Sequence, residues 1–231
     1  MSRANFLEVV DFAERTEADA QLCTDERAAA RRFLDDLRAD KYDFRPELPE
    51  FLIAGIERQF CHQQGESLDG RPLRGKPFIL QPWQKFICYT LGGFWVHGSG
   101  IRRYNECFEM LCRKNGKTPF TTALCWVLGQ YQSASFSKIK TVAGSLKQNM
   151  EGFGFLSYNL HRLGLTLKED TMHGLRELDS SLGHSFKGPM FKGYIEFEAL
   201  AYKPEIFDAF NANIIHLDEL ELYRNAVPYG R

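Results

Sequence analysis

The sequence contains no segment that is long and apolar enough to span a bilayer. The longest apolar run, residues 86–96, is interrupted by Gly92 and Gly93 and is shorter than the roughly 20 residues that a transmembrane helix needs. Residues 1–15 carry charges of both signs and lack the apolar centre of a signal peptide. These absences argue against a membrane protein and predict a cytoplasmic location.

The cysteines follow no metal-binding or disulfide pattern. None of the six stands in a C-x-x-C pair, and Cys61 with His62 is the one adjacent Cys/His couple. Two ligands are too few for a structural zinc site, which takes four. We therefore expect reduced, buried thiols, as in most cytosolic proteins.

A strong net charge is also missing. The 29 Lys and Arg residues nearly balance the 30 Asp and Glu residues, which leaves a net charge of −1. There is thus no global basic field of the kind that attracts nucleic acid, and any DNA-binding surface must be local. With 231 residues, of which 44% are hydrophobic, the chain can form one large domain or a core with an appendage.

Turn-forming residues divide the chain into two parts. Glycine and proline recur between residues 65 and 77, which predicts a connector. Residues 1–64 show apolar positions at helical spacing, with one helix predicted to have Thr24 as its N-cap, and they indicate a helical N-terminal region. Residues 78–231 mix helical and strand patterns, including predicted strands at 138–143 and 194–201, and indicate an α/β core.

One predicted helix carries a basic face whose role stays open. This face either contacts phosphates or is a solvated surface, since Asp35, Asp36 and Asp40 are interleaved with it, and the solvated surface is the better interpretation. The basic residues are Arg27, Arg31, Arg32 and Arg38.

A phosphate-binding motif begins the second half of the chain. The loop at 113–118 follows the apolar run 108–111, predicted as a strand, and leads into a helical pattern at 119–131. A strand, a glycine loop and a helix form a P-loop, whose backbone N–H groups surround a phosphate. Leu111 stands where the consensus has its first glycine. The predicted nucleotide-binding residues are Arg113, Lys114, Asn115, Gly116, Lys117 and Thr118.

A second motif supplies two carboxylates. The apolar stretch 213–217 predicts a buried strand that ends in Asp218 and Glu219. In a parallel sheet, ligands bind at the carboxyl ends of the strands, so both motifs can face one site. We expect Lys117 to contact the β- and γ-phosphates, and Thr118 and Asp218 to hold Mg²⁺. Glu219 is then placed to orient and deprotonate the attacking water, which favours ATP hydrolysis over kinase chemistry.

Three side chains have two interpretations each. Arg113 either stabilises transition-state charge on the γ-phosphate or forms a salt bridge. Trp83 and Gln84 stand early in a helix predicted from Pro82. They either stack on and hydrogen-bond an adenine or are a core tryptophan and a surface glutamine. His216, within the strand, is expected in the core.

Four segments together resemble the large terminase subunit of tailed double-stranded DNA phages. They are residues 78–86, 100–103, 112–118 and 214–220, and the third is similar to the Walker A type that reads Arg-Lys-Asn-Gly-Lys-Ser/Thr. The resemblance covers nearly the whole chain. It implies a RecA-like P-loop ATPase fold, a three-layer α/β core with a mainly parallel sheet. By resemblance, Trp83 and Gln84 belong to the adenine motif, Arg113, Lys117 and Thr118 to Walker A, Asp218 to the metal site and Glu219 to catalysis.

The same resemblance implies a motor that uses ATP and Mg²⁺ to move double-stranded DNA into a procapsid. The implied partners are the portal protein, the small terminase subunit and further copies in a ring on the portal, in the host cytoplasm. The sequence ends at Arg231, before the family's coupling motif and nuclease domain. The family's ring also supplies an arginine in trans, for which Arg162, Arg176 and Arg224 are candidates. Two alternatives stay open: a non-catalytic fragment that binds nucleotide or a packaging partner, and a helicase-like DNA translocase.

Overall fold

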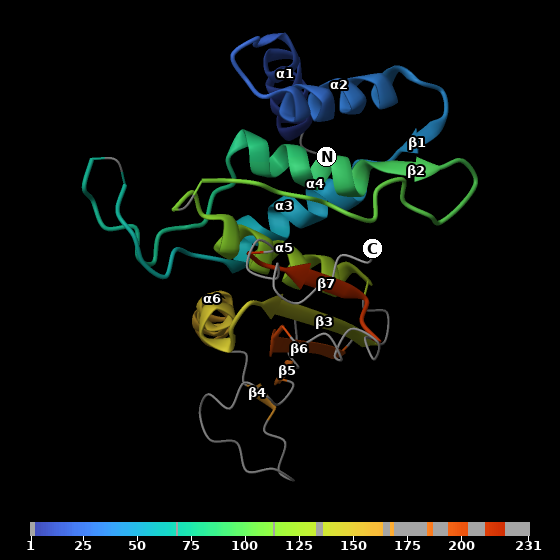
Figure 1. Ribbon diagram of the computed structural model, residues 1–231. Helices are drawn as coiled ribbons and strands as arrows, with labels where there is room; N and C mark the ends of the chain where they lie inside the picture. The colour runs from blue at the N-terminus through green and yellow to red at the C-terminus, as the bar shows by residue number, and fades with distance from the viewer. Residues whose placement is uncertain are drawn as a thin grey trace, which may run out of the picture. The chain divides into compact units, whose positions relative to one another are not determined.

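The computed structural model describes residues 3–67, 69–112, 114–132, 136–163, 167–168, 184–186, 194–202 and 211–219. The chain forms two compact units (Figure 1). The first unit comprises Met1–Arg58 and Pro77–Leu111, and the second comprises Gln59–Lys76 and Cys112–Arg231. This division differs from the expected one, in which a connector at 65–77 separates a region at 1–64 from a core at 78–231.

Specific contacts explain the division. In the first unit, the Lys85 ammonium pairs with Glu8 at 2.7 Å, which ties α4 (Pro82–Gly93) to α1 (Arg3–Ala18). In the second unit, Asn159 accepts a hydrogen bond from the Cys61 backbone N–H at 2.7 Å, and Phe60 stacks on Phe155 with ring centroids 5.5 Å apart. Residues next to the predicted connector are therefore fixed by partners about a hundred positions away.

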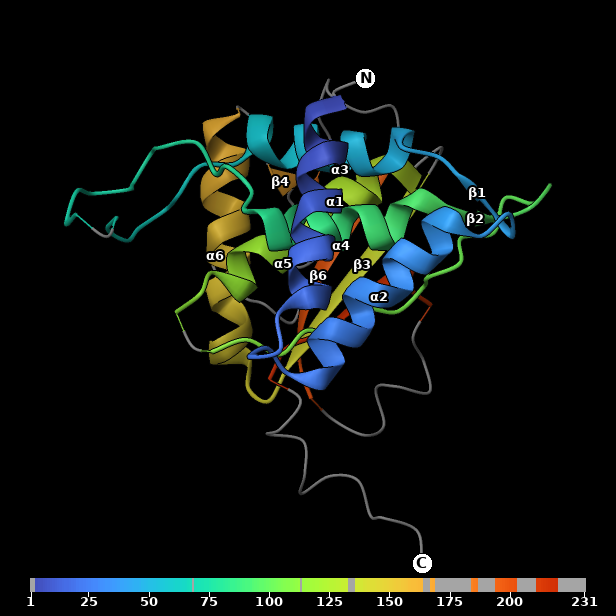
Figure 2. The same cartoon turned by 90° about the horizontal axis from the view of Figure 1, so that it is seen from above.

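The first unit is built mainly from helices. Besides α1 and α4 it contains α2 (Thr24–Arg38), the two short strands β1 (Tyr42–Phe44) and β2 (Phe94–Val96), and α3 (Glu47–Gln59), whose last residue belongs to the second unit. Helices α1 and α2 lie next to each other and α1 also packs on α4 (Figures 1 and 2). Aromatic rings fill the space between them, and Phe33 meets Phe94 edge to face at a centroid distance of 5.5 Å.

Two local predictions in the first unit need correction. Helix α2 is capped by Cys23 rather than Thr24, because the Cys23 Sγ accepts the hydrogen bond from the Glu26 N–H at 3.4 Å. In helix α4, one interpretation placed Trp83 in the core and Gln84 at the surface. The helix instead buries Gln84, Lys85, Cys88 and Tyr89, whose polar members have partners within the unit.

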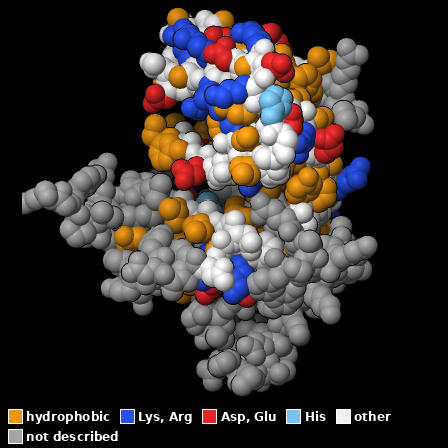
Figure 3. Space-filling view, turned by 90° about the vertical axis from the view of Figure 1, so that its right-hand side faces the viewer, with side chains coloured by type: hydrophobic (Ala, Val, Ile, Leu, Met, Phe, Trp, Pro, Cys, Tyr) orange, Lys and Arg blue, Asp and Glu red, His pale blue; other side chains and the backbone are white. Residues whose placement is uncertain are grey.

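The basic face of α2 is engaged with neighbouring groups. Arg31 pairs with Glu17 at 2.9 Å, Arg27 donates to the Glu17 backbone oxygen at 3.1 Å, and the Arg32 guanidinium lies over the Tyr104 ring. Figure 3 shows basic and acidic side chains interspersed on the exposed face of this unit. This arrangement favours the solvated-surface interpretation.

Asp36, expected on that exposed face, is buried instead. Only 7% of its surface is exposed, and it accepts a hydrogen bond from Arg103 Nε at 2.6 Å. The Arg103 guanidinium also lies 4.2 Å from the centroid of the Tyr42 ring. A buried carboxylate requires such a charged partner, since burial of an unpaired charge is costly.

The thiols form no disulfide, but only half of them are buried as expected. Cys61, Cys88 and Cys125 are buried, whereas Cys23, Cys107 and Cys112 are exposed. Within the described residues, no helix has both the length and the apolar character needed to cross a membrane.

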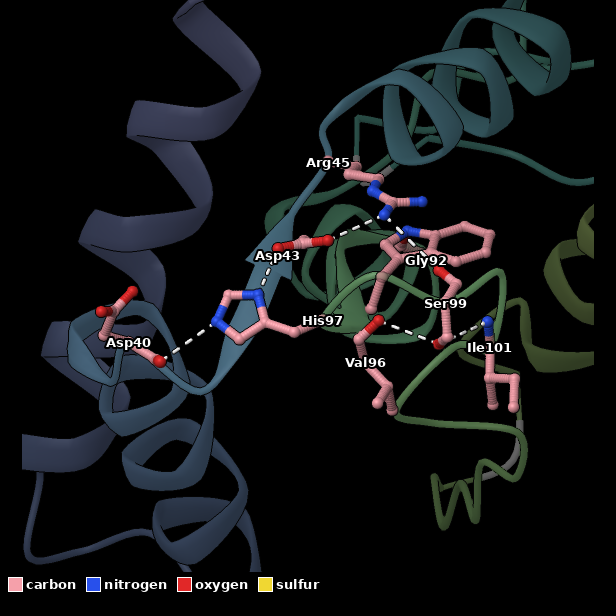
Figure 4. Close-up of polar contacts among 9 residues, drawn as sticks. Asp40, Asp43, Arg45, Gly92, Val96, His97, Ser99 and Ile101 are labelled. Carbon is pink, nitrogen blue, oxygen red and sulfur yellow. Dashed lines mark hydrogen bonds and ion pairs between the residues drawn. The ribbon is translucent and has the colours of Figure 1, made fainter.

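Strands β1 and β2 pair antiparallel, and a polar cluster beside them includes His97 (Figure 4). The His97 ring contacts the Asp43 carboxylate through Nδ1 and the Asp40 carbonyl oxygen through Nε2, at 3.1 Å for the latter. Arg45 donates to the other carboxylate oxygen of Asp43 at 2.8 Å. Because both ring nitrogens face acceptors, the doubly protonated imidazolium fits this cluster best.

The second unit contains the α/β sheet. Helix α5 (Lys117–Gln132) is followed by β3 (Phe136–Ala143), α6 (Leu146–Arg162), β4 (Leu167–Lys168), β5 (His184–Phe186), β6 (Tyr194–Ala201) and β7 (Ile214–Leu217). The strand order is β4-β5-β6-β3-β7 (Figure 1). Strand β3 is parallel to its neighbours β6 and β7, whereas β5 is antiparallel to its neighbours β4 and β6. The predicted strands at 138–143, 194–201 and 213–217 are thereby confirmed. The last was expected to be buried, and this part is wrong, since Ile215 and Leu217 are 46% and 36% exposed.

Both helices of the second unit pack on one face of the sheet. A Cβ on Gly129 of α5 would lie 2.7 Å from Ile139 Cδ1 of β3. Thr141, two residues further along β3 and so on the same face, donates to Asn149 Oδ1 of α6 at 2.8 Å. The described residues of this unit therefore form two layers, helices on sheet. The third layer of the expected core is not seen among them.

The apolar run before the phosphate loop was expected to be a strand, and this expectation is wrong. Residues 104–112 have no helix or strand assignment, and Phe108 and Met110 are 77% and 82% exposed. A strand is held by hydrogen bonds to a neighbour, and among the described residues this segment has no such neighbour.

The contacts of His97 predict a measurable titration. Its hydrogen bond with Asp43 raises the pKa of His97 above its ordinary value. The imidazolium therefore stabilises this cluster below the ordinary histidine pKa of about 6.5, and the contribution is lost as the pH rises through the raised value. We expect NMR titration of His97 to show the raised pKa and Asp43→Asn to lower it. His62, whose pKa burial lowers, is the internal control, and an unshifted His97 would contradict the prediction.

Candidate phosphate-binding site

The loop before α5 has the backbone geometry of an anion site. Lys114 and Gly116 have positive φ values of 69° and 75° on either side of Asn115. Left-handed residues in such a turn direct successive N–H groups to one side, which forms a concave anion-binding nest. Helix α5 begins at Lys117, so the positive end of its dipole lies at the same place.

Two segments a hundred residues apart meet at this loop. The Lys117 Nζ lies 2.9 Å from Asp218 Oδ1, and the Thr118 hydroxyl donates to Asp218 Oδ2 at 3.2 Å. Asp218 directly follows β7, and its backbone N–H continues the ladder by donating to the Val142 oxygen at 2.8 Å. The register of β7 against β3 therefore fixes the carboxylate at the N-terminus of α5.

The charge state of Asp218 is set by these neighbours. Burial raises the pKa of Asp218, but the hydrogen bond from Lys117, the nearby His216 and the Thr118 hydroxyl outweigh it and leave the pKa below its ordinary value. The carboxylate is thus ionised at neutral pH. Burial lowers the pKa of His216, so the imidazole is neutral at neutral pH. The side chain is half-buried rather than in the core, where it was expected.

Glu219 is held in an unusual backbone conformation beside Asp218. Its φ of 53° lies in the left-handed region, which costs a residue with a Cβ on the order of 1–3 kcal/mol. Its N–H donates to Asp218 Oδ1 at 3.0 Å, and its carboxylate oxygen Oε2 accepts a hydrogen bond from Gln148 Nε2 at 2.6 Å. The first bond holds the Glu219 backbone, and the second orients its side chain.

Gln148 also belongs to this site, although neither the phosphate-loop motif nor the Asp-Glu motif predicted it. It lies in the first turn of α6, where Ser145 is the N-cap. The Ser145 N–H donates to Gln148 Oε1 at 3.1 Å, and the Gln148 N–H donates to Ser145 Oγ at 3.3 Å. The sequence Ser-x-x-Gln after a strand is a capping-box signal, so the helix start was readable but its contact with Glu219 was not.

Close packing brings α6 against the first turns of α5. A Cβ on Gly152 would lie 2.8 Å from Thr122 Oγ1 and 3.2 Å from Thr118 Cγ2. Asn149, which is 7% exposed, donates through Nδ2 to the backbone oxygens of Thr141 and Leu200 at 2.6 and 2.9 Å. Glycine at 152 and asparagine at 149 thus set the spacing between the sheet, α6 and Thr118.

The structure brings together four of the predicted site residues. Lys117, Thr118, Asp218 and Glu219 form one cluster, and Lys114, Asn115 and Gly116 form the loop beside it. Arg113 lies outside the described residues.

Gln84 and Trp83 belong to α4 in the first unit. The Gln84 side chain is 4% exposed, and its Oε1 accepts a hydrogen bond from the Gln81 N–H at 2.8 Å. That bond caps the start of α4, so the surface position considered for Gln84 is wrong. The adenine contact of Trp83 and Gln84 stays a prediction. Of the candidate trans-acting arginines, Arg162 donates to the Gln59 backbone oxygen at 2.9 Å, and Arg176 and Arg224 lie outside the described residues.

The donor set of the cluster fits a small hard cation and a phosphate. The Thr118 hydroxyl and the Asp218 carboxylate supply oxygen ligands next to the Lys117 ammonium. Mg²⁺ is commonly bound by one or two such ligands, substrate phosphates and water. Among the described residues there is no group of three or more His, Cys, Asp or Glu side chains that forms an all-protein metal cage. Magnesium with a nucleotide therefore fits these residues better than zinc.

Comparison of this chain with protein-family models, curated proteins and solved structures found no match.

The packing of Gly152 predicts a specific sensitivity. We expect Gly152→Ala to lower the free energy of unfolding by about 1–3 kcal/mol, since the added methyl group would collide with Thr122 and displace Thr118. Gly154→Ala is the matched control, because a Cβ there meets nothing within 4 Å and alanine in a helix interior stabilises by up to about 1 kcal/mol. Urea denaturation measures both. Equal stabilities of the two variants would show that α6 does not pack against Thr118 this closely.

Proposed function

We propose that this chain is the ATP-hydrolysing motor domain of a viral DNA-packaging terminase large subunit. The observation that carries the nucleotide part of the proposal is the convergence of Lys117 and Thr118 on Asp218, at 2.9 and 3.2 Å. Accidental Gly-Lys-Thr and Asp-Glu sequences have no reason to meet at the carboxyl end of a parallel strand. In open α/β sheets this end is where ligands bind.

Each residue of the cluster has a role in hydrolysis. The loop N–H groups and Lys117 bind the β- and γ-phosphates, and Thr118 and Asp218 hold Mg²⁺, which when bound neutralises phosphate charge. A water oxygen bonds to the γ-phosphorus while the bond from phosphorus to the β,γ-bridging oxygen breaks, and that electron pair leaves with ADP. Glu219 orients this water and accepts its proton.

The packaging role is supported by the sequence resemblance rather than by the cluster alone. The segments at 78–86 and 112–118 are similar to the adenine and Walker A motifs of phage large terminases. The proposal therefore includes double-stranded DNA, the portal protein and the small terminase subunit as partners, and a ring of copies on the portal in the host cytoplasm. Arg113 is proposed to stabilise the transition-state charge.

One observation favours a second candidate, a non-catalytic fragment that binds nucleotide or a packaging partner. The segment 104–112, which leads into the phosphate loop, pairs with no described strand, and Met110 is 82% exposed. A loop that is not anchored by a strand on its N-terminal side positions its ligand less rigidly, and rigid placement of the reacting groups is a large part of catalysis.

Steady-state ATP hydrolysis with Mg²⁺ separates the two candidates. We expect Lys117-dependent hydrolysis in the wild-type chain, and Lys117→Ala to lower kcat/KM by on the order of a hundredfold, because a positioned charge on the phosphates is lost. Glu219→Gln should keep nucleotide affinity within about twofold and lower kcat by a factor of about 10²–10⁴, the usual contribution of a general base.

Lys147→Ala is the matched lysine control, since Lys147 is exposed on α6 and has no partner in this cluster among the described residues. Circular dichroism melting of every variant separates lost activity from lost folding. A wild-type chain that binds ATP but hydrolyses none of it, with portal protein and DNA present, would favour the non-catalytic fragment.

A further inference from the structure

The Glu219 carboxylate has one described side-chain partner, and this partner comes from a different structural element. Gln148 Nε2 donates to Glu219 Oε2 at 2.6 Å, whereas the Glu219 N–H is occupied with Asp218. Within the described residues, no hydrogen bond to the other carboxylate oxygen of Glu219, Oε1, accompanies this contact. Gln148 thus holds one oxygen and leaves the second able to accept a proton.

Gln148 is itself well anchored. Its side-chain Oε1 accepts from the Ser145 N–H at 3.1 Å, and its backbone N–H donates to Ser145 Oγ at 3.3 Å, so that Ser145 holds both the amide group and the backbone of Gln148. Ser145 follows β3 by two residues, and β3 is the parallel neighbour of β7. The donor therefore lies in the first turn of the helix that follows β3, and the acceptor lies just after β7, the strand next to β3. The pairing of the two strands sets the distance between these two places.

The chemistry of the amide suits this task. A neutral amide donor orients a carboxylate without neutralising its negative charge. A lysine or arginine would instead form an ion pair, which would make it less favourable for the carboxylate to accept a proton. Glu219 needs such support, because it follows the strand in a left-handed conformation with φ of 53°. A carboxylate that activates a single water molecule is less effective when its side chain can rotate between conformers, since small misplacements of reacting groups slow the reaction.

We propose that Gln148 is a positioning residue that holds the Glu219 carboxylate in the direction required for activating water. This inference rests on the proposed function, because it gives Glu219 the role of the base. It adds a residue from α6 that lies outside both the phosphate-loop motif and the Asp-Glu motif, and it makes the Ser145 capping box part of the active-site support.

The contact can be tested without any activity. In the nucleotide-free chain, we expect the Gln148 side-chain amide protons to exchange slowly with solvent in NMR spectra, and to exchange as fast as those of an exposed glutamine in Glu219→Ala. The amide of exposed Gln64 is the reference. Fast exchange of the Gln148 amide in the wild-type chain would overturn the inference.

The kinetic test uses Gln148→Ala, Gln148→Asn and the neighbouring control Lys147→Ala. We expect Gln148→Ala to lower kcat about tenfold or more with KM for ATP within about twofold, since the loss concerns water activation rather than ATP binding. Gln148→Asn, which keeps the amide on a shorter side chain, should recover part of kcat. Lys147→Ala should match the wild type, and melting curves should confirm folding.

The outcomes separate this inference from the proposed function. If the wild-type chain hydrolyses ATP and Gln148→Ala has the same or a higher kcat, the positioning role is wrong although the ATPase proposal stands. If kcat and KM change together in Gln148→Ala, the residue supports the fold of the site and the inference is also wrong. A wild-type chain without Lys117-dependent hydrolysis overturns both proposals.

Discussion

The ion pair between Lys117 and Asp218 is the interaction on which the arrangement of the candidate site depends. Its two atoms lie 2.9 Å apart, and the Asp218 side chain is only 13% exposed. A carboxylate at this depth is stable as an ion only if a cation compensates it. The pair therefore holds the N-terminus of α5 against the end of β7, and with it the loop and the Thr118 hydroxyl. The two groups that neutralise each other are also those that would receive a phosphate and a metal in the proposed site.

Strand β3 transmits this constraint to the rest of the second unit. It pairs with β7 on one side and β6 on the other, and its Ile139 and Thr141 contact α5 and α6 respectively. Positions without a large side chain set the distances, since Gly129 and Gly152 admit neighbours closer than a Cβ would allow. In closely packed protein interiors, the addition of even a single methyl group changes the stability. The geometry of the cluster is thus a property of the whole layer of two helices on a sheet.

Elements with a strong local pattern were predictable from the sequence. Strand β6 matches its predicted bounds because Ile195, Phe197 and Ala199 alternate and are all buried, and the Asp218–Glu219 pair was placed by the apolar stretch before it. Features that depend on distant partners were not predictable. The segment around Cys61 joins the second unit through Asn159, and Gln148 meets Glu219 through the register of β7 on β3. The run at 108–111 shows the converse, since apolar residues alone do not make a strand without a neighbour.

The missing strand before the phosphate loop does not remove the supports of the cluster. Lys117 and Thr118 are placed by α5, Asp218 by its ladder bond to Val142, and Glu219 by Asp218 and Gln148. All of these contacts lie within the second unit and none involves residues 104–111. In the proposed site, phosphate binding uses Lys117 together with the N–H groups of the loop before α5. Coupling of hydrolysis to movement of DNA needs more, because a chemical step produces motion only where a second element has two arrangements that the ligand states favour differently. In the proposed motor, this cluster would supply the chemistry of hydrolysis, and a separate element with two such arrangements would couple it to the movement of DNA.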